Sequence, residues 1–354
     1  MWLLLHALAG DWAVAFYIAG PPVTHTTRAL MPTFPDSSEL CVCFAHIAYQ
    51  MEAVYGQRKQ AIRHFQTRSL EETAQRLPEA HVLAISGIWQ NDLLEQAGKL
   101  QYIQSIGAGY DQFPLDELHQ RGIRLANARG ANRNAVSEHT FGLILGLLRK
   151  IHEARDNQRR HQWRGMISNI SEREDELAGK TLGIVGMGHI GSRVASIAKA
   201  FDMRVIACKR NTASYEGPAD EVVGADAVGD LLDRSDVVVL NCPLNDETRS
   251  LIDAQALARM MPTAILINVA RGACVDTEAL LQALEAGEIA GAGLDVFDPE
   301  VLAPENGLWD RDDVIITPHT AGETQAYEAN VIDILQENIA RLQRGETVLL
   351  NQIV

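Results

Sequence analysis

The sequence predicts an α/β protein built on parallel sheets, and three observations lead to this prediction. From Leu40 onward, short apolar runs alternate with amphipathic helical segments, the pattern of strands joined by helical crossovers. Many of these runs are continuously apolar and β-branched, as strands covered on both faces should be. The length of 354 residues exceeds one ordinary core, so we expect roughly two domains.

Residues 1–36 are expected to form an N-terminal extension outside both domains. The run Met1–Gly20 is apolar, but Asp11 interrupts it and the first arginine is Arg28. A membrane span needs about 20 apolar residues without a central charge, and a secretory signal needs a basic start. An upstream-extended start or a surface extension is therefore favoured over export, and no membrane attachment is expected.

The first domain is predicted to contain four strands with helices between them. Ser69 and Glu72 form a capping box that opens one helix, and Gly122 ends another. A strongly apolar helix follows over Ala135–Lys150, and we expect it to be buried between the domains. The strands are Cys41–Ala45, His81–Ser86, Tyr102–Ile106 and Arg124–Asn127.

The second domain is predicted to be a doubly wound sheet, because its strands alternate with helical crossovers. One of these helices follows Asp276 and stops at Gly287. The long helix after His319 has no strand nearby, so it is expected to return to the first domain. The six strands are Thr181–Val185, Val205–Cys208, Asp236–Asn241, Ala264–Val269, Ala290–Val296 and Val314–Thr317.

A glycine-rich turn directly follows the first strand of this second sheet and opens a helix. Its sequence is Gly186-Met-Gly188-His-Ile-Gly191. The first glycine allows a tight turn, the second a close approach of a pyrophosphate, and the third close packing of helix on strand. The free N–H groups at the start of the helix would hold the phosphates. This context predicts a Rossmann dinucleotide site rather than an empty glycine turn.

The end of the next strand determines which dinucleotide is preferred. NAD sites usually carry Asp or Glu there to bind the ribose 2′-hydroxyl, but this strand ends at Cys208-Lys209-Arg210. Lysine and arginine can pair with a 2′-phosphate. NADP(H) is therefore favoured, with NAD(H) as the alternative if the two cations are only surface charges.

Three further strand ends carry residues suited to the reduction of a 2-oxo acid. They are Arg271, Glu300 and His319. A guanidinium binds a carboxylate in bidentate fashion, an imidazole supplies a proton near neutral pH, and a carboxylate orients the imidazole. Each of the three also has an ordinary structural interpretation, but their occurrence at three strand ends of one dinucleotide fold favours catalysis.

At these motifs the sequence resembles the D-isomer-specific 2-hydroxyacid dehydrogenase family, which includes glyoxylate/hydroxypyruvate reductases. Further similar segments are Ser105–Asp111, Asn132–His139 and Asn241–Leu244, and the resemblance extends from about Leu40 onward. It implies a Rossmann domain at 135–322 and a flavodoxin-like, discontinuous substrate domain at 37–134 and 323–354. It also implies a homodimer and NAD(P)-dependent hydride transfer at carbon 2 of a small 2-oxo or 2-hydroxy acid, with His319 as proton donor or acceptor.

The resemblance implies two sets of binding residues. Substrate is expected at Gly107, Ala108, Gly109 and Arg271. Cofactor is expected at Gly186, Gly188, His189, Ile190, Gly191, Lys209, Arg210, Cys242, Pro243, Thr248, Val269, Ala270, Asp295, His319, Ala321 and Gly322. The family glutamate is usually followed by proline, whereas Val301 follows Glu300 here, so the geometry of this loop is open. His139 is expected to be a satisfied core residue rather than a rival to His319.

Composition limits the remaining alternatives. The net charge of −15 argues against binding to nucleic acid, which requires a basic face. The five cysteines show no metal-binding spacing, so we expect no metal, reduced thiols and a cytoplasmic protein. The second functional hypothesis is a nucleotide-sensing protein similar to the corepressors of the same family. Steady-state reduction of a small 2-oxo acid would distinguish an enzyme from such a sensor.

Overall fold

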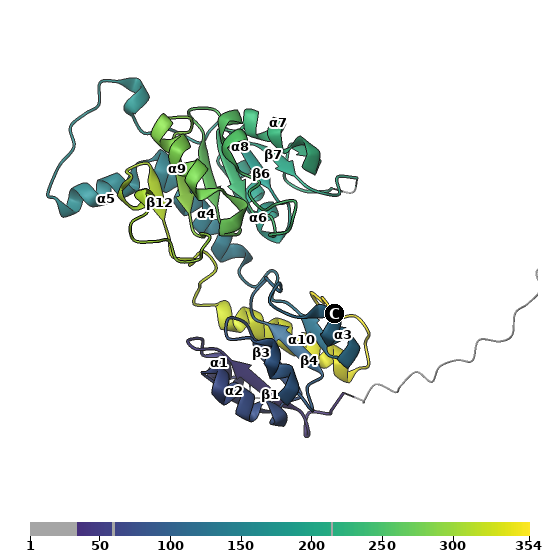
Figure 1. Ribbon diagram of the computed structural model, residues 1–354. Helices are drawn as coiled ribbons and strands as arrows, with labels where there is room; N and C mark the ends of the chain where they lie inside the picture. Colours follow the sequence, from purple (N-terminus) through teal and green to yellow (C-terminus); the bar gives the residue numbers. More distant parts are fainter. Residues whose placement is uncertain (1–33, 59–60, 214) are drawn as a thin grey trace, which may run out of the picture. The chain divides into compact units, whose positions relative to one another are not determined.

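The computed structural model describes residues 34–58, 61–213 and 215–354, which contain two separate parallel sheets (Figure 1). The predicted N-terminal extension lies outside the described residues, apart from residues 34–36. Neither sheet contains an antiparallel pair of strands in the described part of the chain. The α/β class and the parallel arrangement predicted from the sequence are therefore confirmed.

The first sheet has five strands in the order β2-β1-β3-β4-β5. Its three inner strands are buried at every residue, which accounts for their continuously apolar sequences. Helix α2 (Leu70–Arg76) begins at the predicted cap, where the Ser69 hydroxyl accepts a hydrogen bond from the N–H of Glu72 at 3.1 Å. The strands are β1 (Cys41–Ala45), β2 (Arg63–Thr67), β3 (Val82–Ile85), β4 (Tyr102–Ser105) and β5 (Arg124–Ala126).

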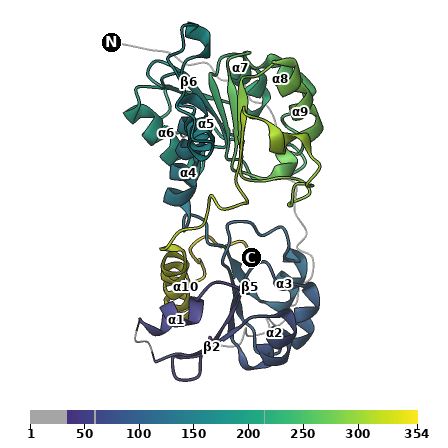
Figure 2. The same ribbon diagram turned by 90° about the vertical axis from the view of Figure 1, so that its left-hand side faces the viewer.

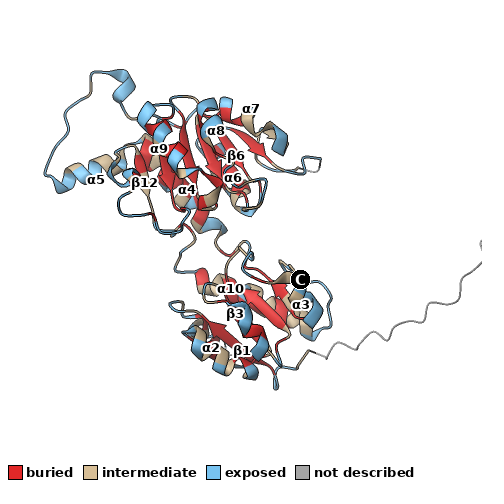
Figure 3. Cartoon of the chain, in the orientation of Figure 1, coloured by how far each residue is buried: buried red, intermediate tan, exposed pale blue. Residues whose placement is uncertain are grey.

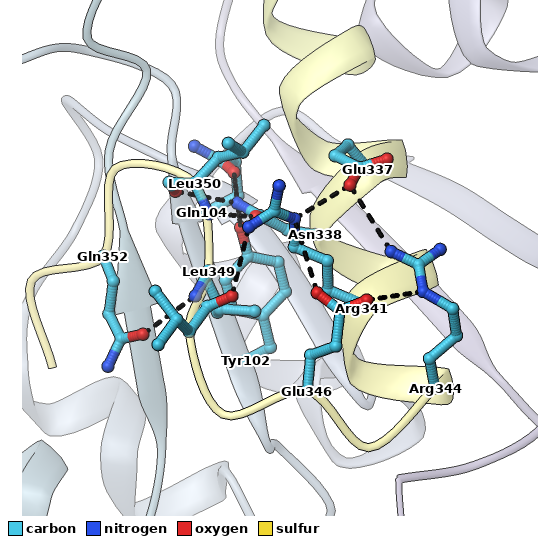
Figure 4. Close-up of polar contacts among 11 residues, drawn as sticks. Tyr102, Gln104, Glu337, Asn338, Arg341, Arg344, Glu346, Leu349, Leu350 and Gln352 are labelled. Carbon is cyan, nitrogen blue, oxygen red and sulfur yellow. Dashed lines mark hydrogen bonds and ion pairs between the residues drawn. The ribbon is translucent and has the colours of Figure 1, made fainter.

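The long helix α10 (Tyr327–Gln343) packs on this first sheet, beside α1 (Met51–Gly56) (Figure 2). Its buried residues share one apolar cluster with side chains of β1, β3 and β4. A polar network adds to this contact (Figure 4). The fully buried Asn338 donates to the Tyr102 hydroxyl at 2.8 Å and accepts from the N–H of Leu350 at 2.7 Å. Helix α10 therefore belongs to the first sheet, although the whole second sheet separates the two in sequence.

The second sheet has seven strands in the order β12-β11-β10-β9-β6-β7-β8. The order reverses at β6, from which the sheet grows in both directions, as a doubly wound sheet must. The strands are β6 (Thr181–Val185), β7 (Arg204–Cys208), β8 (Glu221–Val223), β9 (Val237–Leu240), β10 (Ile265–Asn268), β11 (Gly291–Leu294) and β12 (Val314–Ile316).

Helix α4 packs on this second sheet, against β10, β11 and β12 and against α6. Its apolar residues point in several directions, and eight of its residues are buried. A helix that is apolar all round is expected in such a covered position. The other helices are α3 (Leu115–Arg121), α4 (Arg133–Leu148), α5 (Ile151–Arg159), α6 (His189–Ala200), α7 (Val228–Asp233), α8 (Ala254–Arg259) and α9 (Thr277–Ala286).

Helix α5 and the segment after it project from the second sheet and are mostly exposed (Figures 1 and 3). We call residues 151–174 the arm. It exposes the apolar side chains of Ile151, Trp163, Met166 and Ile170, of which Trp163 is 99% exposed. None of the described helices is long and apolar enough to cross a membrane.

Candidate active site

The predicted cofactor and catalytic residues lie at the carboxyl ends of parallel strands, where doubly wound folds bind their ligands. The glycine turn follows β6, Lys209 follows β7 and Cys242 follows β9. Arg271, Asp295 and His319 follow β10, β11 and β12 in the same sheet. The substrate loop of Gly107, Ala108 and Gly109 follows β4 of the first sheet.

The glycine turn has the geometry that a dinucleotide pyrophosphate needs. Gly186 has φ +103°, and a Cβ placed on it would lie 2.6 Å from the backbone of Asn241 and Cys242. A Cβ on Gly191 would lie 2.3 Å from the carbonyl oxygen of Gly186, so helix α6 can approach only a glycine there. Gly188, the N-cap of α6, has open space around it and no side chain caps the helix. Free N–H groups and a positive dipole therefore face that space.

Asn241 is a residue of this region whose role the sequence did not reveal. It follows β9 and lies against Gly186. Both polar atoms of its amide are buried and lack a hydrogen-bond partner among the described residues. A buried amide without a partner is unfavourable, so its presence beside the phosphate turn fits a site completed by a bound group. Together with the open face at Gly188, this observation shows that the turn fits a dinucleotide.

The remaining cofactor candidates surround the turn. Thr248 donates from its hydroxyl to the carbonyl of Pro243 at 2.7 Å, which closes the loop that follows Cys242. The Lys209 ammonium lies 5.6 Å from the centre of the Tyr215 ring, and Arg210 is exposed. Neither cation forms an ion pair with a described carboxylate, so both are available to an anionic group.

His189 and Ile190 open helix α6 and are at least partly exposed, so their backbone N–H groups belong to the phosphate-facing end of the helix. The pKa of His189 is lowered from its usual value by partial burial first and then by the positive charges of Arg129 and Arg133. A neutral ring beside a phosphate site leaves phosphate binding to the backbone N–H groups at the start of the helix.

Arg271 is held at the end of β10 by its neighbours in the chain. The buried amide of Asn268 donates to the Arg271 carbonyl at 3.0 Å and accepts from the N–H of Ala270 at 3.0 Å. These bonds fix the turn through Val269 and Ala270. A Cβ on Gly272 would lie 1.8 Å from the carbonyl carbon of Phe297, so only glycine lets this turn touch the loop that carries Glu300.

His319 and Glu300 form a direct pair. The Nδ1 atom of His319 and the Oε1 atom of Glu300 are within hydrogen-bond distance. Both side chains are about half exposed, and Nε2 of His319 has no partner among the residues that the structure describes. A carboxylate on Nδ1 sets the tautomer and orientation of the ring and leaves Nε2 free to exchange a proton. Arg271 makes no hydrogen bond or ion pair with either of them in the described chain.

Asp295 organises the loop that carries His319. Its carboxylate is 1% exposed and accepts from the Thr317 hydroxyl at 2.5 Å and from the N–H groups of Thr320 and Ala321 at 2.9 and 3.0 Å. Its backbone carbonyl accepts from the N–H of His319 at 2.8 Å. At the end of this loop, a Cβ on Gly322 would lie 3.0 Å from the Asn132 amide nitrogen. Asp295 therefore ties the end of β11 to the loop that follows β12.

The substrate loop presents backbone donors. The Ser105 hydroxyl lies 3.2 Å from the carbonyls of Gly107 and Gly109, and the Asn127 amide donates to the carbonyl of Ala108 at 2.7 Å. The N–H groups of Gly107, Ala108 and Gly109 have no acceptor within the described ranges. The carbonyl groups of the loop therefore accept hydrogen bonds from Ser105 and Asn127, while its N–H groups are free, and such an arrangement can bind an anion.

Arg271 approaches this same loop. A Cβ on Gly109 would lie 2.6 Å from Nη2 of Arg271, so the glycine makes room for the guanidinium. The structure thus brings the free N–H groups and the guanidinium, the two predicted carboxylate-binding features, to one place. Among the described residues, no group of His, Cys, Asp or Glu has the arrangement of a metal site.

Comparisons with known proteins agree with this geometry. Residues 141–321 match the model of the D-isomer specific 2-hydroxyacid dehydrogenase NAD-binding domain. The chain is 39% identical over 260 residues to a glyoxylate reductase of Aeropyrum pernix, covering 72% of this chain and 77% of that protein.

Two solved structures are similar over most of the chain. A D-isomer specific 2-hydroxyacid dehydrogenase family protein of Aeromonas salmonicida superposes with a TM-score of 0.79 at 30% identity, covering 90% of this chain and 99% of that one. An acyclic imino acid reductase in complex with NADPH and D-Arg gives 0.76 at 26% identity, covering 89% of this chain and 100% of that one. The chain therefore belongs to the D-isomer specific 2-hydroxyacid dehydrogenase family and is an NAD(P)-dependent oxidoreductase that acts on the CH–OH group of 2-hydroxy acids.

Proposed function

We propose that this protein reduces a small 2-oxo acid to the 2-hydroxy acid, with His319 as the proton donor and NADP(H) as the preferred cofactor. The observation that carries the proposal is the pair of His319 and Glu300, in which Nε2 of the His319 ring has no partner among the described residues. A histidine held by a carboxylate on one nitrogen and free on the other is suited to proton transfer.

Arg271 and the loop of Gly107, Ala108 and Gly109 bind the carboxylate of the substrate in this proposal. The free N–H groups and the guanidinium supply charge-assisted hydrogen bonds from two directions. With the carboxylate held, the neighbouring carbonyl oxygen is directed toward Nε2 of His319, which donates the proton as that oxygen gains charge. A bound nicotinamide would supply the hydride to carbon 2.

The same assignment divides the chain into a substrate domain, residues 37–134 and 323–354, and a dinucleotide-binding domain, residues 135–322, with 1–36 as an extension. The packing of α10 with β1, β3 and β4 supports the first, discontinuous domain. The match of the family model to residues 141–321 supports the second.

The substrate is proposed to be glyoxylate or hydroxypyruvate. The named activity of the Aeropyrum pernix relative supports a short 2-oxo acid. Arg271 and the loop N–H groups contact only the carboxylate that all 2-oxo acids share, so they set the class of substrate and not its length.

The preference for NADP(H) rests on Lys209 and Arg210. They stand where NAD-binding members carry an acid, and neither is paired with a described carboxylate. The similarity to a reductase solved with NADPH is consistent with this assignment. Lys209→Asp is expected to raise the KM for NADPH at least about tenfold and to favour NADH, because an acid repels the 2′-phosphate and binds a 2′-hydroxyl. An unchanged NADPH/NADH ratio would contradict this role.

We further propose a homodimer through the dinucleotide-binding domain. The arm exposes Trp163, Met166 and Ile170, apolar side chains of the kind that a second copy would cover. All five cysteines are free and buried, which suits a reducing, cytoplasmic setting. Light scattering of the wild type and of a Trp163→Asp variant tests the dimer, which this variant should weaken.

The experiment that tests the main proposal is oxidation of NADPH and NADH by the purified protein against a panel of 2-oxo acids. Turnover with a short 2-oxo acid is expected, with loss of at least about a hundredfold in kcat for His319→Ala and in kcat/KM for Arg271→Ala. Near wild-type rates in both variants would refute the assignment. Tight dinucleotide binding without turnover on any acid would favour the sensor hypothesis.

A further inference from the structure

A series of polar side chains, of which Asp295 is buried and His139 and Thr317 are partly exposed, joins helix α4 to the loop that carries His319. Nε2 of His139, on α4, lies 2.9 Å from the hydroxyl oxygen of Thr317. That hydroxyl lies 2.5 Å from Oδ1 of Asp295, and the His139 nitrogen itself is 3.6 Å from the same oxygen. The three residues come from α4, the end of β12 and the end of β11. His139 has a hydrogen-bond partner as expected, but its side chain is 24% exposed, so the expectation of a core residue was wrong.

The hydrogens in this series can be assigned. Asp295 also accepts from the backbone N–H groups of Thr320 and Ala321, so it acts as an acceptor at both oxygens. The single hydrogen of the Thr317 hydroxyl is therefore donated to Asp295, and Thr317 can only accept from His139. His139 must carry a hydrogen on Nε2, and the direction of donation runs from α4 through Thr317 to the carboxylate.

We infer that His139 is a positioning residue for the reaction: through Thr317 and Asp295 it holds the loop that presents His319. The inference rests on the proposed function of His319. In the described chain no hydrogen bond or ion pair joins His139 to His319 or Glu300, so its effect passes through Thr317 and Asp295.

The backbone of His319 explains why the loop needs this support. Its φ is +55°, a left-handed conformation that residues other than glycine rarely adopt. The bonds from the N–H groups of His319, Thr320 and Ala321 to Asp295 hold the chain in that conformation. Asp295 is buried. Among the lysine, arginine and histidine side chains of the described chain, His139 alone lies within 4 Å of its carboxylate.

Two substitutions at His139 distinguish its role as a hydrogen-bond donor from a role in filling space. In His139→Gln, the amide nitrogen stands as many bonds from the backbone as Nε2 of histidine and keeps the donor. His139→Leu keeps similar bulk without a donor. We expect kcat to fall roughly 10- to 100-fold in His139→Leu and to stay within about threefold in His139→Gln, with the substrate KM little changed in both.

His152→Leu is the matched control. His152 lies on the neighbouring helix α5, and its two ring nitrogens lie 3.0 and 2.7 Å from the carbonyl oxygens of Gly146 and Asp312, its partners among the described residues. His152→Leu removes a histidine and its contacts with these carbonyls without touching the series of His139, Thr317 and Asp295, so kcat should be unchanged. Equal losses of kcat in His139→Gln and His139→Leu would overturn the donor role, as would a wild-type kcat in His139→Leu.

A double-mutant cycle tests whether His139 acts through Thr317. If it does, Thr317→Val should lower kcat about as much as His139→Leu, and the double variant should be no worse than either. Additive losses would overturn the link. If His139→Leu does not fold, Thr317→Val compared with Thr317→Ser, which keeps the hydroxyl, measures the same connection.

Hydrogen exchange provides a readout that does not depend on turnover. The amides of Thr320 and Ala321 should exchange roughly five- to tenfold faster in His139→Leu than in the wild type, the factor that the loss of one buried hydrogen bond corresponds to. Unchanged exchange would overturn the inference. An inactive wild type that still shows the change in exchange would refute the proposed function and leave the positioning link intact.

Discussion

Gly272 offers a sensitive test of the proposed active-site geometry, because its lack of a side chain lets the loops that carry Arg271 and Glu300 touch. A Cβ at this position would lie 1.8 Å from the carbonyl carbon of Phe297 and 2.0 Å from its oxygen. Ordinary contacts of a Cβ begin at 3.4 Å, so Gly272→Ala must separate the two backbones by about 1.6 Å. The neighbour is backbone rather than a flexible side chain, so no change of rotamer relieves the clash.

The displacement acts directly on the proposed chemistry. Arg271 precedes the glycine, and Glu300 lies three residues beyond Phe297. A misplacement of 1 Å at a catalytic group can reduce the rate about a hundredfold, so we expect Gly272→Ala to lower kcat/KM for the best 2-oxo acid by at least about that factor. The assay is steady-state oxidation of the nicotinamide cofactor, with thermal unfolding measured in parallel to show that the variant is folded.

Gly142→Ala is the matched control for this substitution. Gly142 lies inside helix α4, and a Cβ there would meet nothing within 4 Å. Alanine in place of glycine inside a helix stabilises by up to about 1 kcal/mol, so this variant should keep its activity and unfold at a slightly higher temperature. Wild-type kcat/KM in Gly272→Ala would refute the claim that contact between the two loops positions Arg271.

Three further predictions concern stability and cofactor binding. Asn338→Ala should lower the free energy of unfolding by about 2–3 kcal/mol, measured by denaturant titration, because it removes the hydrogen bonds of Asn338 with the Tyr102 hydroxyl and with the N–H and carbonyl of Leu350. Asn241→Leu should unfold at a higher temperature without cofactor, because it removes a buried unpaired amide, yet bind the dinucleotide roughly tenfold more weakly by fluorescence titration. Burial and the charges of Arg129 and Arg133 lower the pKa of His189 in the folded protein. The contribution of His189 to stability is therefore complete above its unfolded pKa near 6.5 and is lost as the pH falls through its lower folded pKa. Between about pH 7.5 and 5.5 the wild type should lose more stability than His189→Gln, and equal losses would contradict this.

Most strands were predictable because they lie inside a sheet and are apolar on both faces. Strands β2 and β8 were not predicted. Strand β2 reads Arg-His-Phe-Gln-Thr and β8 reads Glu-Val-Val, and both lie at a sheet edge. An edge strand needs to bury less of its surface, so polar residues replace the continuous apolar run that reveals an inner strand.

The candidate site was predictable where a local motif carries the chemistry, as in the glycine turn and at His319. The supporting roles of Asn268, Asn241 and Thr317 were not. Each depends on which strand ends lie side by side, since a short polar side chain acts on whatever the sheet order places next to it. Asp295 shows the same limit. Its place at a strand end was predicted, but its hydrogen bonds to the loop of His319 were not.

The place of α10 has a consequence for how the chain folds during synthesis. Strands β1 to β5 leave the ribosome first, but the apolar face that α10 covers stays open until residues 327–343 have been made. The second sheet consists of strands that lie between β5 and α10 in the sequence, so its core can be completed earlier. The first sheet is therefore the last to fold, and its uncovered strands are the part of the nascent chain that chaperones would need to protect from aggregation.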